Sequence, residues 1–288
     1  MDVIIPTKDA AEHLETCLVS LKRQTTPVNI LIVDAYSKDG TRRIAEQHGA
    51  TVYNEPPSET PGSRRAVACN EGLRHSNSNL VGFVDADTEM PPEWAEQLSK
   101  YFEIHGVAAV TSGCVGQAEG KLGEAITWLI QFGSTHARNF NEATDIESCP
   151  GYNSIYRRKA IDEVGGFNEE IGGCEDWELN KRIRDRDYKI LGVPRSPVVH
   201  HERKTAKAFS QQMYGYAWSR ARLAKVTGPF TPLHATPLPF IVLYPVKKIL
   251  TNTLDQMSEK MPAKTTLFLA FLLMGTSWAH GYIKGLFD

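Results

Sequence analysis

The chain has 288 residues, of which 41% are hydrophobic, and a net charge of −2. It can therefore form a sizeable core, and its composition excludes a disordered or low-complexity protein. Five widely spaced cysteines, odd in number and without a CxxC pair, argue against a disulfide framework and a zinc site and favour a reducing compartment.

Apolar, β-branched runs alternate with helical patterns through the first hundred residues. The opening MDVIIPTKDA lacks the features of a secretory signal and is typical of a first strand. The strand-like runs occupy residues 3–6, 29–34, 50–54 and 80–85. Between the first two, a helix is expected with one apolar face formed by Leu14, Leu18 and Leu21. This order predicts an α/β fold with a mostly parallel central sheet and flanking helices.

The middle of the chain is less regular. Residues 106–150 are rich in glycine and polar residues, and only a short helix around 125–132 is predicted there. After Gly151 the pattern predicts a strand, a helix and a glycine turn, followed by a helix that opens on Glu175 and Asp176. One or two short strands then end at His200 and His201. With no repeat or linker, residues 1–205 are expected to form one domain.

The tail, residues 206–288, has a different character. Residues 200–288 carry 11 basic and 4 acidic residues, whereas residues 1–199 carry 21 and 30. A helix with Phe209, Met213 and Tyr216 or Ala217 on one face suits either a membrane interface or ordinary packing on the domain. Residues 265–283 contain no Asp, Glu, Lys or Arg, which is compatible with a weak membrane span or a surface-seated helix. The apolar run 238–246 is too short to span. The tail is therefore expected to be helical and membrane-associated, and no nucleic-acid partner is expected.

Two carboxylates, Asp85 and Asp87, end the fourth strand-like run in the sequence FVDADTEM. Like charges this close repel each other, so a divalent metal or a metal-balanced phosphate is expected beside them. In open α/β sheets ligands bind beyond the carboxyl ends of the strands, where Asp34 is also expected. A strand ending in two acids also occurs in dehalogenase-type phosphatases, with Asp85 as the nucleophile, but there the motif lies near the start of the chain.

Several motifs occur together and in one order over residues 2–205. They are VIIPTKDA, ILIVDAYSKDGT, GSRRAVACNEG, FVDADTEMPPEW, YNSIYRRKAIDEVGGFNE and GGCEDWELNKRI. In this order they resemble the inverting, nucleotide-sugar-dependent glycosyltransferases of family 2, which have the GT-A fold. One departure concerns Cys69, since many members have Ala-Arg-Asn where this chain has Ala-Cys-Asn. A basic contact there must come from Arg64 or Arg65, or be missing.

The resemblance implies roles for the charged residues. Asp87 and Asp85 would hold Mn²⁺ or Mg²⁺ against the donor diphosphate, with a further contact from His200 or His201. Asp176 would be the catalytic base that takes the proton of the attacking hydroxyl, with Glu175 as the alternative. The nucleotide-sugar would be bound by Thr7, Asp34, Arg64, Arg65 and Asp85. The acceptor side would be formed by Gly165, Gly166, Phe167 and Trp177.

The expected function is thus metal-assisted, inverting transfer of a sugar from a nucleotide-diphospho-sugar to a lipid-linked or growing glycan acceptor. The expected location is the cytoplasmic face of a membrane. Besides the phosphatase, two alternatives stay open. A sugar-phosphate nucleotidyltransferase would usually begin with a glycine-rich basic loop, which VIIPTKDAAEH is not. A non-catalytic membrane scaffold would leave Asp85, Asp87 and Asp176 without a joint task.

Overall fold

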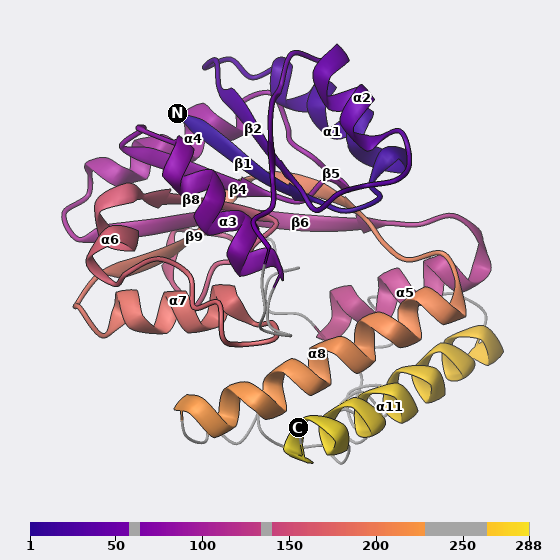
Figure 1. Ribbon diagram of the computed structural model, residues 1–288. Coiled ribbons are helices and arrows are strands. Elements are labelled where there is room, and N and C mark those ends of the chain that lie inside the picture. The colour runs from indigo at the N-terminus through magenta and orange to yellow at the C-terminus, as the bar shows by residue number, and fades with distance from the viewer. Residues whose placement is uncertain (58–63, 134–139, 228–263, 288) are drawn as a thin grey trace. The chain divides into compact units, whose positions relative to one another are not determined.

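The computed structural model describes residues 1–57, 64–133, 140–227 and 264–287 (Figure 1). Its residue contacts define two compact units. The first comprises Met1–Val115, Arg138–Glu170 and Glu175–His201, and the second comprises Gly116–Ala137, Ile171–Cys174 and Glu202–Asp288. The boundary at residue 205 stays a prediction.

The first unit is built on a mixed β-sheet with the strand order β3-β2-β1-β4-β8-β6-β9-β5. The parallel strands are β1 (Asp2–Thr7), β2 (Asn29–Asp34), β3 (Thr51–Asn54) and β4 (Leu80–Val84). The others are β5 (Thr88–Glu89), β6 (Val107–Gln117), β7 (Thr144–Asp145), β8 (Asn153–Arg157) and β9 (Lys189–His201). Antiparallel pairing joins β4 to β8, β8 to β6, β9 to β5 and β9 to β7. The four predicted strands are confirmed, but the sheet is mixed rather than mostly parallel.

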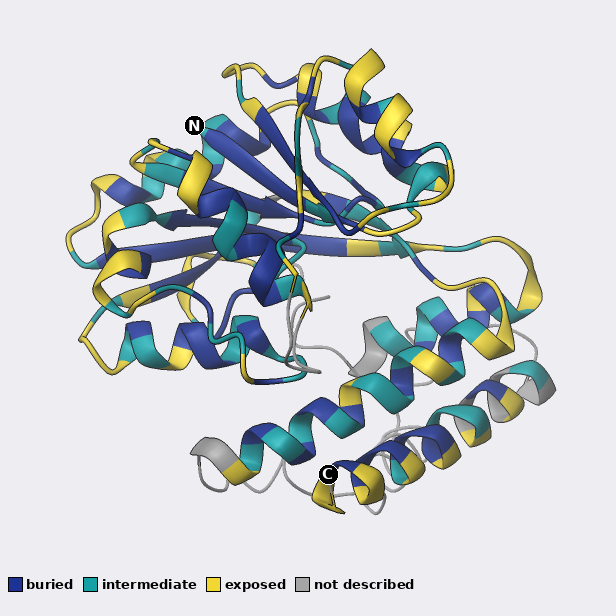
Figure 2. Ribbon diagram, viewed as in Figure 1, coloured by how far each residue is buried: buried dark blue, intermediate teal, exposed yellow. Residues whose placement is uncertain are grey.

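Helices pack against both faces of this sheet. They are α1 (Ala11–Lys22), α2 (Thr41–Gln47), α3 (Arg64–His75), α4 (Trp94–Ser99), α6 (Arg158–Glu163) and α7 (Glu175–Arg184), with a 3₁₀ turn at Lys100–Glu103. Neighbouring residues of a strand point to opposite faces, so Val3 joins the core that includes α1 while Ile4 joins the core that includes α3. Figure 2 shows the central strands β1, β2, β4 and β8 largely buried, as expected for the middle of a sheet covered on two sides.

The structure also defines the secondary structure after residue 106, where the sequence pattern predicted only one short helix. The segment 107–117 is one long strand, β6, whose alanines, glycines and hydroxyl residues give little periodic signal. The predicted helix around 125–132 lies within α5 (Gly120–Gly133). A single strand, β9, replaces the predicted one or two short strands before His200.

The second unit contains α5, α8 (Ala206–Thr227) and α11 (Lys264–Phe287). The predicted apolar face of α8 is confirmed with Ala217 as its third member, because Ala217 is buried and Tyr216 is exposed. Among the described helices none has the length and apolarity that crossing a membrane would require. The run 238–246 lies outside the described residues.

Candidate active site

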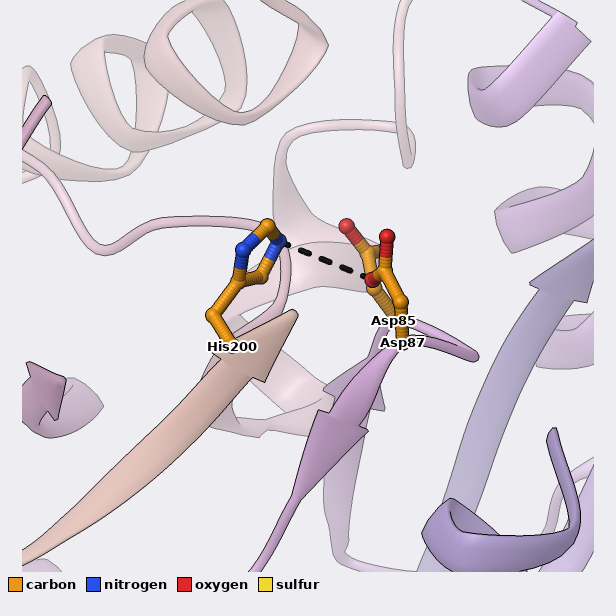
Figure 3. Close-up of side chains that lie close together, drawn as sticks. All are labelled: Asp85, Asp87 and His200. Atoms are coloured by element: carbon orange, nitrogen blue, oxygen red, sulfur yellow. Dashed lines mark ion pairs between the residues drawn. The ribbon is translucent and has the colours of Figure 1, made fainter. Parts of the chain in front are cut away.

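Asp85, Asp87 and His200 form a cluster at the end of β4 (Figure 3). The two acids follow the last residue of β4, and the chain then enters the short strand β5. Because β5 pairs with β9 in a register that sets Thr88 opposite His200, the imidazole arrives beside the acids. His200 Nε2 lies 3.6 Å from Asp87 Oδ1, and one ligand atom from each of the three residues lies within 4.8 Å of the other two.

The neighbouring histidine, His201, has different contacts. Successive residues of a strand point to opposite faces, and the His201 ring stacks on that of His13 with 4.5 Å between the ring centroids. His201 Nε2 lies 2.6 Å from Glu89 Oε1. Of the two predicted candidates, the structure therefore brings His200 to the acids and places His201 in a separate pair with Glu89.

The cluster suits a divalent cation by its donor chemistry. It offers carboxylate oxygens from two half-buried acids and an imidazole nitrogen from a third half-buried side chain. Carboxylates suit Mg²⁺ and Mn²⁺, and an imidazole among them is more typical of a transition metal such as Mn²⁺. The residues present thus fit the predicted metal.

Arg65 connects the cluster to α7. Its guanidinium forms an ion pair with Asp85, lies 3.1 Å from Glu175 Oε1 through Nε, and donates from Nη2 to the carbonyl of Gly151 over 2.6 Å. Burial opposes the charge on Arg65, but the nearby carboxylates outweigh it and hold the pKa of Arg65 above its ordinary value. Arg65 is thus occupied by protein carboxylates, whereas the prediction gave it a contact with the nucleotide-sugar.

Arg65 also accounts for the departure at Cys69. The two residues lie one turn apart on α3. Burial raises the pKa of the Cys69 thiol to about 12, so this side chain is uncharged at neutral pH. The positive charge in this part of the unit is therefore supplied by Arg65.

Asp176 lies in the first turn of α7 and is half-buried. It directly follows Glu175, the residue that pairs with Arg65. Its Oδ2 accepts a hydrogen bond from the backbone N–H of Gly151 over 3.0 Å, and its Oδ1 accepts one from the N–H of Trp177 over 2.8 Å. Glu175 is 6% exposed and faces Arg65. The two neighbouring carboxylates are thereby distinguished, because Glu175 is held in an ion pair and Asp176 is held by backbone N–H groups.

Thr7 and Asp34 stand at the carboxyl ends of the adjacent strands β1 and β2, as predicted. Thr7 Oγ1 donates to Asp34 Oδ1 over 3.0 Å, and the Ser37 N–H donates to Asp34 Oδ2 over 3.0 Å. Thr7 is 4% exposed and Asp34 is 2% exposed. These contacts show both side chains shaping the turn after β2. Arg64 is largely exposed, and its Nε lies 2.9 Å from Glu55 Oε1.

Three of the four predicted acceptor-side residues, Gly165, Gly166 and Phe167, lie in a turn held by Asn70. Gly165 and Gly166 have φ angles of 81° and 80°, the left-handed region that favours glycine. Asn70 Oδ1 accepts from the Phe167 N–H, and Asn70 Nδ2 donates to the Phe167 carbonyl. Phe167 is buried in the core, so it supports the turn from beneath, while Trp177 is half-buried on α7.

Two contacts of the site were not predicted. Gly151 is held by both Arg65 and Asp176, and the Tyr152 ring lies 5.0 Å from the His200 ring. Both residues precede β8, which pairs with β4 and thereby brings them near Asp85. A long-range antiparallel pairing of this kind leaves no local pattern in the sequence, so no signal pointed to them.

Comparison with known proteins gives a consistent result. Residues 2–165 match the model of the family described as "Glycosyl transferase family 2". The succinoglycan biosynthesis protein ExoA of Rhizobium meliloti is 25% identical over 230 residues, which cover 76% of this chain and 68% of ExoA. The pre-mycofactocin glycosyltransferase of Mycobacterium tuberculosis is 26% identical over 229 residues, which are 77% of this chain and about half, 47%, of that protein.

Among solved structures, the mannosyltransferase PcManGT from Pyrobaculum calidifontis, in complex with GDP-Man and Mn²⁺, superposes with a TM-score of 0.63. The match covers 100% of this chain and 87% of PcManGT at 20% sequence identity. At this level of identity the likeness concerns the fold, and it agrees with the predicted GT-A architecture.

Proposed function

This chain belongs to glycosyl transferase family 2, and we propose that it transfers a sugar from a nucleotide-diphospho-sugar to a lipid-linked or growing glycan acceptor with inversion at the anomeric carbon. One observation carries the proposal: a single side chain, Arg65, contacts both Asp85 of the Asp85–Asp87–His200 cluster and Glu175, the neighbour of Asp176. Arg65 thus links the cluster suited to a leaving diphosphate to the start of α7, where Asp176, the group suited to an acceptor hydroxyl, is held by the Gly151 N–H.

The donor end of the reaction is assigned to the acidic cluster. Asp87, with His200 and Asp85, would hold Mn²⁺ or Mg²⁺. When bound, the cation would neutralise the negative charge that develops on the departing diphosphate. The complex of PcManGT with GDP-Man and Mn²⁺ supports this assignment by analogy of fold. The ion pair with Arg65 holds the Asp85 carboxylate in position beside the other members of the cluster.

The acceptor end is assigned to Asp176. Inversion requires a base on the side of the sugar opposite the leaving group, and a carboxylate near the attacking hydroxyl can take its proton. The N–H groups of Gly151 and Trp177 orient the Asp176 carboxylate, and Gly151 is itself fixed by Arg65. Glu175, committed to Arg65, is assigned a positioning role.

The nucleoside is assigned to the rim after β1 and β2. Thr7, Asp34 and the turn that they brace lie at the carboxyl ends of two parallel strands, where ligands of α/β sheets bind. Arg64, which is largely exposed, is available for the base or the diphosphate. The turn at Gly165 and Gly166 lies on the segment assigned to the acceptor, and the open space beside Gly165, where a Cβ atom would meet nothing within 4 Å, permits close approach of a sugar.

The phosphatase alternative has little support in the geometry. Asp85, its required nucleophile, follows the fourth strand of the chain, whereas that class places the motif near the start of the chain. Family membership likewise supports sugar transfer rather than nucleotidyl transfer.

The test is to incubate the protein with UDP-, GDP- and dTDP-sugars in the presence of Mn²⁺, Mg²⁺ or a chelator, and to measure release of the nucleoside diphosphate and of inorganic phosphate separately. We expect one donor class to release its nucleoside diphosphate, with the release stopped by the chelator and restored by metal. Release of inorganic phosphate instead, or failure of every donor to bind with either metal, would overturn the proposal.

A further inference from the structure

Helix α11 packs through one side on α8. Trp278 and Tyr282 of α11 lie in one apolar cluster with Phe209 and Met213 of α8. Gly281 faces α8 so closely that a Cβ atom placed on it would lie 2.2 Å from the Tyr214 carbonyl oxygen. This close contact fixes the rotation of α11 about its own axis and therefore determines which residues point away from α8.

Large apolar residues also point away from α8, on a side of the helix that includes the exposed Thr276 and His280. Five large hydrophobic residues of α11 are exposed, by 45% to 84%: Leu269, Leu272, Ile283, Leu286 and Phe287. With 3.6 residues per turn, these positions lie along one side of the helix, opposite Gly281 and Trp278. We call these five residues the outer face of α11. A helix that is apolar on two opposite sides requires an apolar partner on both, and α8 together with α5 supplies one of them.

The charges of α8 and α11 indicate the chemistry of the second partner. These two contacting helices carry six basic residues and no acidic residue: Lys207, Arg220, Arg222, Lys225, Lys264 and Lys284. The guanidinium of Arg220 lies over the Trp278 ring and that of Arg222 over the Trp218 ring, 5.1 and 4.9 Å from the centroids. The whole chain has a net charge of −2, so this positive charge is a local feature.

We infer that the outer face of α11 binds the surface of an anionic lipid bilayer. The five apolar side chains would enter the boundary between the headgroups and the acyl chains, and the exposed Lys207, Lys225 and Lys284 would contact lipid phosphates. A second copy of this chain fits the face less well. In a twofold dimer the same surface meets itself, and the basic helices would repel each other.

The inference is tested by sedimenting the full chain with phosphatidylcholine vesicles and with vesicles that also contain phosphatidylglycerol. No nucleotide is added, so the result is independent of transferase activity. Two matched single variants, Ile283→Ser on the outer face and Ile104→Ser in the first unit, remove similarly exposed isoleucines, 56% and 46% exposed. A third variant, Ile283→Ser with Phe287→Ser, removes more of the face, and Lys207→Gln with Lys225→Gln removes two exposed cations.

We expect the wild type to bind the anionic vesicles, with binding weakened by salt. Ile283→Ser should lower the affinity about tenfold and the double apolar variant further, because each loses an apolar group that the lipid would bury. Ile104→Ser should bind like the wild type, and the lysine variant should bind more weakly. Circular dichroism of each variant checks that it is folded.

Three results would overturn the inference. The wild type could fail to bind either kind of vesicle, or Ile104→Ser could reduce binding as much as Ile283→Ser. The third result is self-association in sedimentation velocity that Ile283→Ser abolishes while vesicle binding is absent, which would assign the face to contact between copies of the chain.

Discussion

Arg65 on α3 forms an ion pair with Asp85, the first acid after β4. The same guanidinium pairs with Glu175 at the start of α7. The side chain of Glu175 is 8% exposed and that of Asp85 is 30% exposed, so the pair with Glu175 is the better shielded from water and the less screened by salt. Arg65 thus joins the acids proposed to hold the metal to the helix that carries the proposed base.

Replacing Arg65 by Gln should destabilise the protein strongly. Without Arg65 the Glu175 carboxylate, whose side chain is 8% exposed, would lose its charged partner, which costs about 1–3 kcal/mol. Arg74→Gln is the matched control, because Arg74 lies on the same helix, is 54% exposed and pairs with Glu71. Such exposed pairs contribute about 0–1 kcal/mol. Urea unfolding measures both variants, and equal small losses would show that Arg65 is not structurally required.

The two neighbouring histidines provide a paired test of the metal site. His200→Ala should weaken binding of Mn²⁺ by about tenfold or more, since it removes one of the proposed ligands. His201→Ala should leave the affinity close to that of the wild type, because His201 contacts Glu89 and His13 instead.

Calorimetric titration of Mn²⁺ into each variant measures the difference. If His201→Ala loses the metal and His200→Ala retains it, the assignment of the ligand is reversed.

Gly165 and Gly166 permit a second paired test. Both have left-handed φ angles, so either substitution by Ala introduces backbone strain of about 1–2 kcal/mol. A Cβ atom on Gly166 would also lie 2.8 Å from Asn70 Oδ1, whereas one on Gly165 would meet no atom within 4 Å. Gly166→Ala should therefore be the more destabilising change and should disturb the hydrogen bonds between Asn70 and Phe167. Thermal unfolding of the two variants checks the order, and a larger loss for Gly165→Ala would contradict it.

Asp39 is expected to make a pH-dependent contribution to the free energy of unfolding. Burial opposes its ionisation, but hydrogen bonds from Thr41 and from the Ala11 N–H outweigh burial and hold the pKa of Asp39 below its ordinary value. A lowered carboxyl pKa stabilises the folded state above the unfolded-state pKa, and this contribution is lost as the pH falls through the folded-state pKa.

Asp39→Ala should therefore lower the free energy of unfolding at neutral pH, by about 0.5 kcal/mol because the residue is exposed. The difference from the wild type should shrink as the pH falls through the lowered pKa of Asp39, which urea titrations at several pH values would follow. A difference that grows on acidification would contradict the assignment.

Local pattern was sufficient to predict the first half of the sheet. The apolar runs of β1, β2 and β4 and the leucine face of α1 each form one strand or one helix with strong periodicity, and each appears where predicted. The acids Asp85 and Asp87 could be placed for the same reason, since they follow directly on a strongly patterned strand. The second half of the sheet was harder to predict. The small residues of β6 give little periodic signal, and the position of β8 depends on antiparallel pairing with β4 and β6, which are distant from it in the sequence.

The choice between neighbouring residues also depended on tertiary structure. His200 and His201 are chemically identical in the sequence, and the register of β9 on β5 determines which one reaches the acids. Likewise, Arg64 and Arg65 are adjacent on the chain, and the helical rotation of α3 exposes the first and turns the second toward Asp85 and Glu175. Sequence patterns located the site, and pairing between distant strands selected its members.

The division of roles between Asp87 and Asp176 is tested most directly by measuring donor binding and sugar transfer separately in Asp87→Asn and Asp176→Asn. Asp185→Asn serves as the control, because Asp185 is an exposed acid just beyond α7 that pairs with Lys181. We expect Asp87→Asn to lose metal-dependent donor binding. Asp176→Asn should bind donor normally and transfer sugar about 100-fold more slowly or worse, while Asp185→Asn behaves like the wild type. Transfer by Asp176→Asn at the wild-type rate, or unchanged metal-dependent donor binding by Asp87→Asn, would contradict the account.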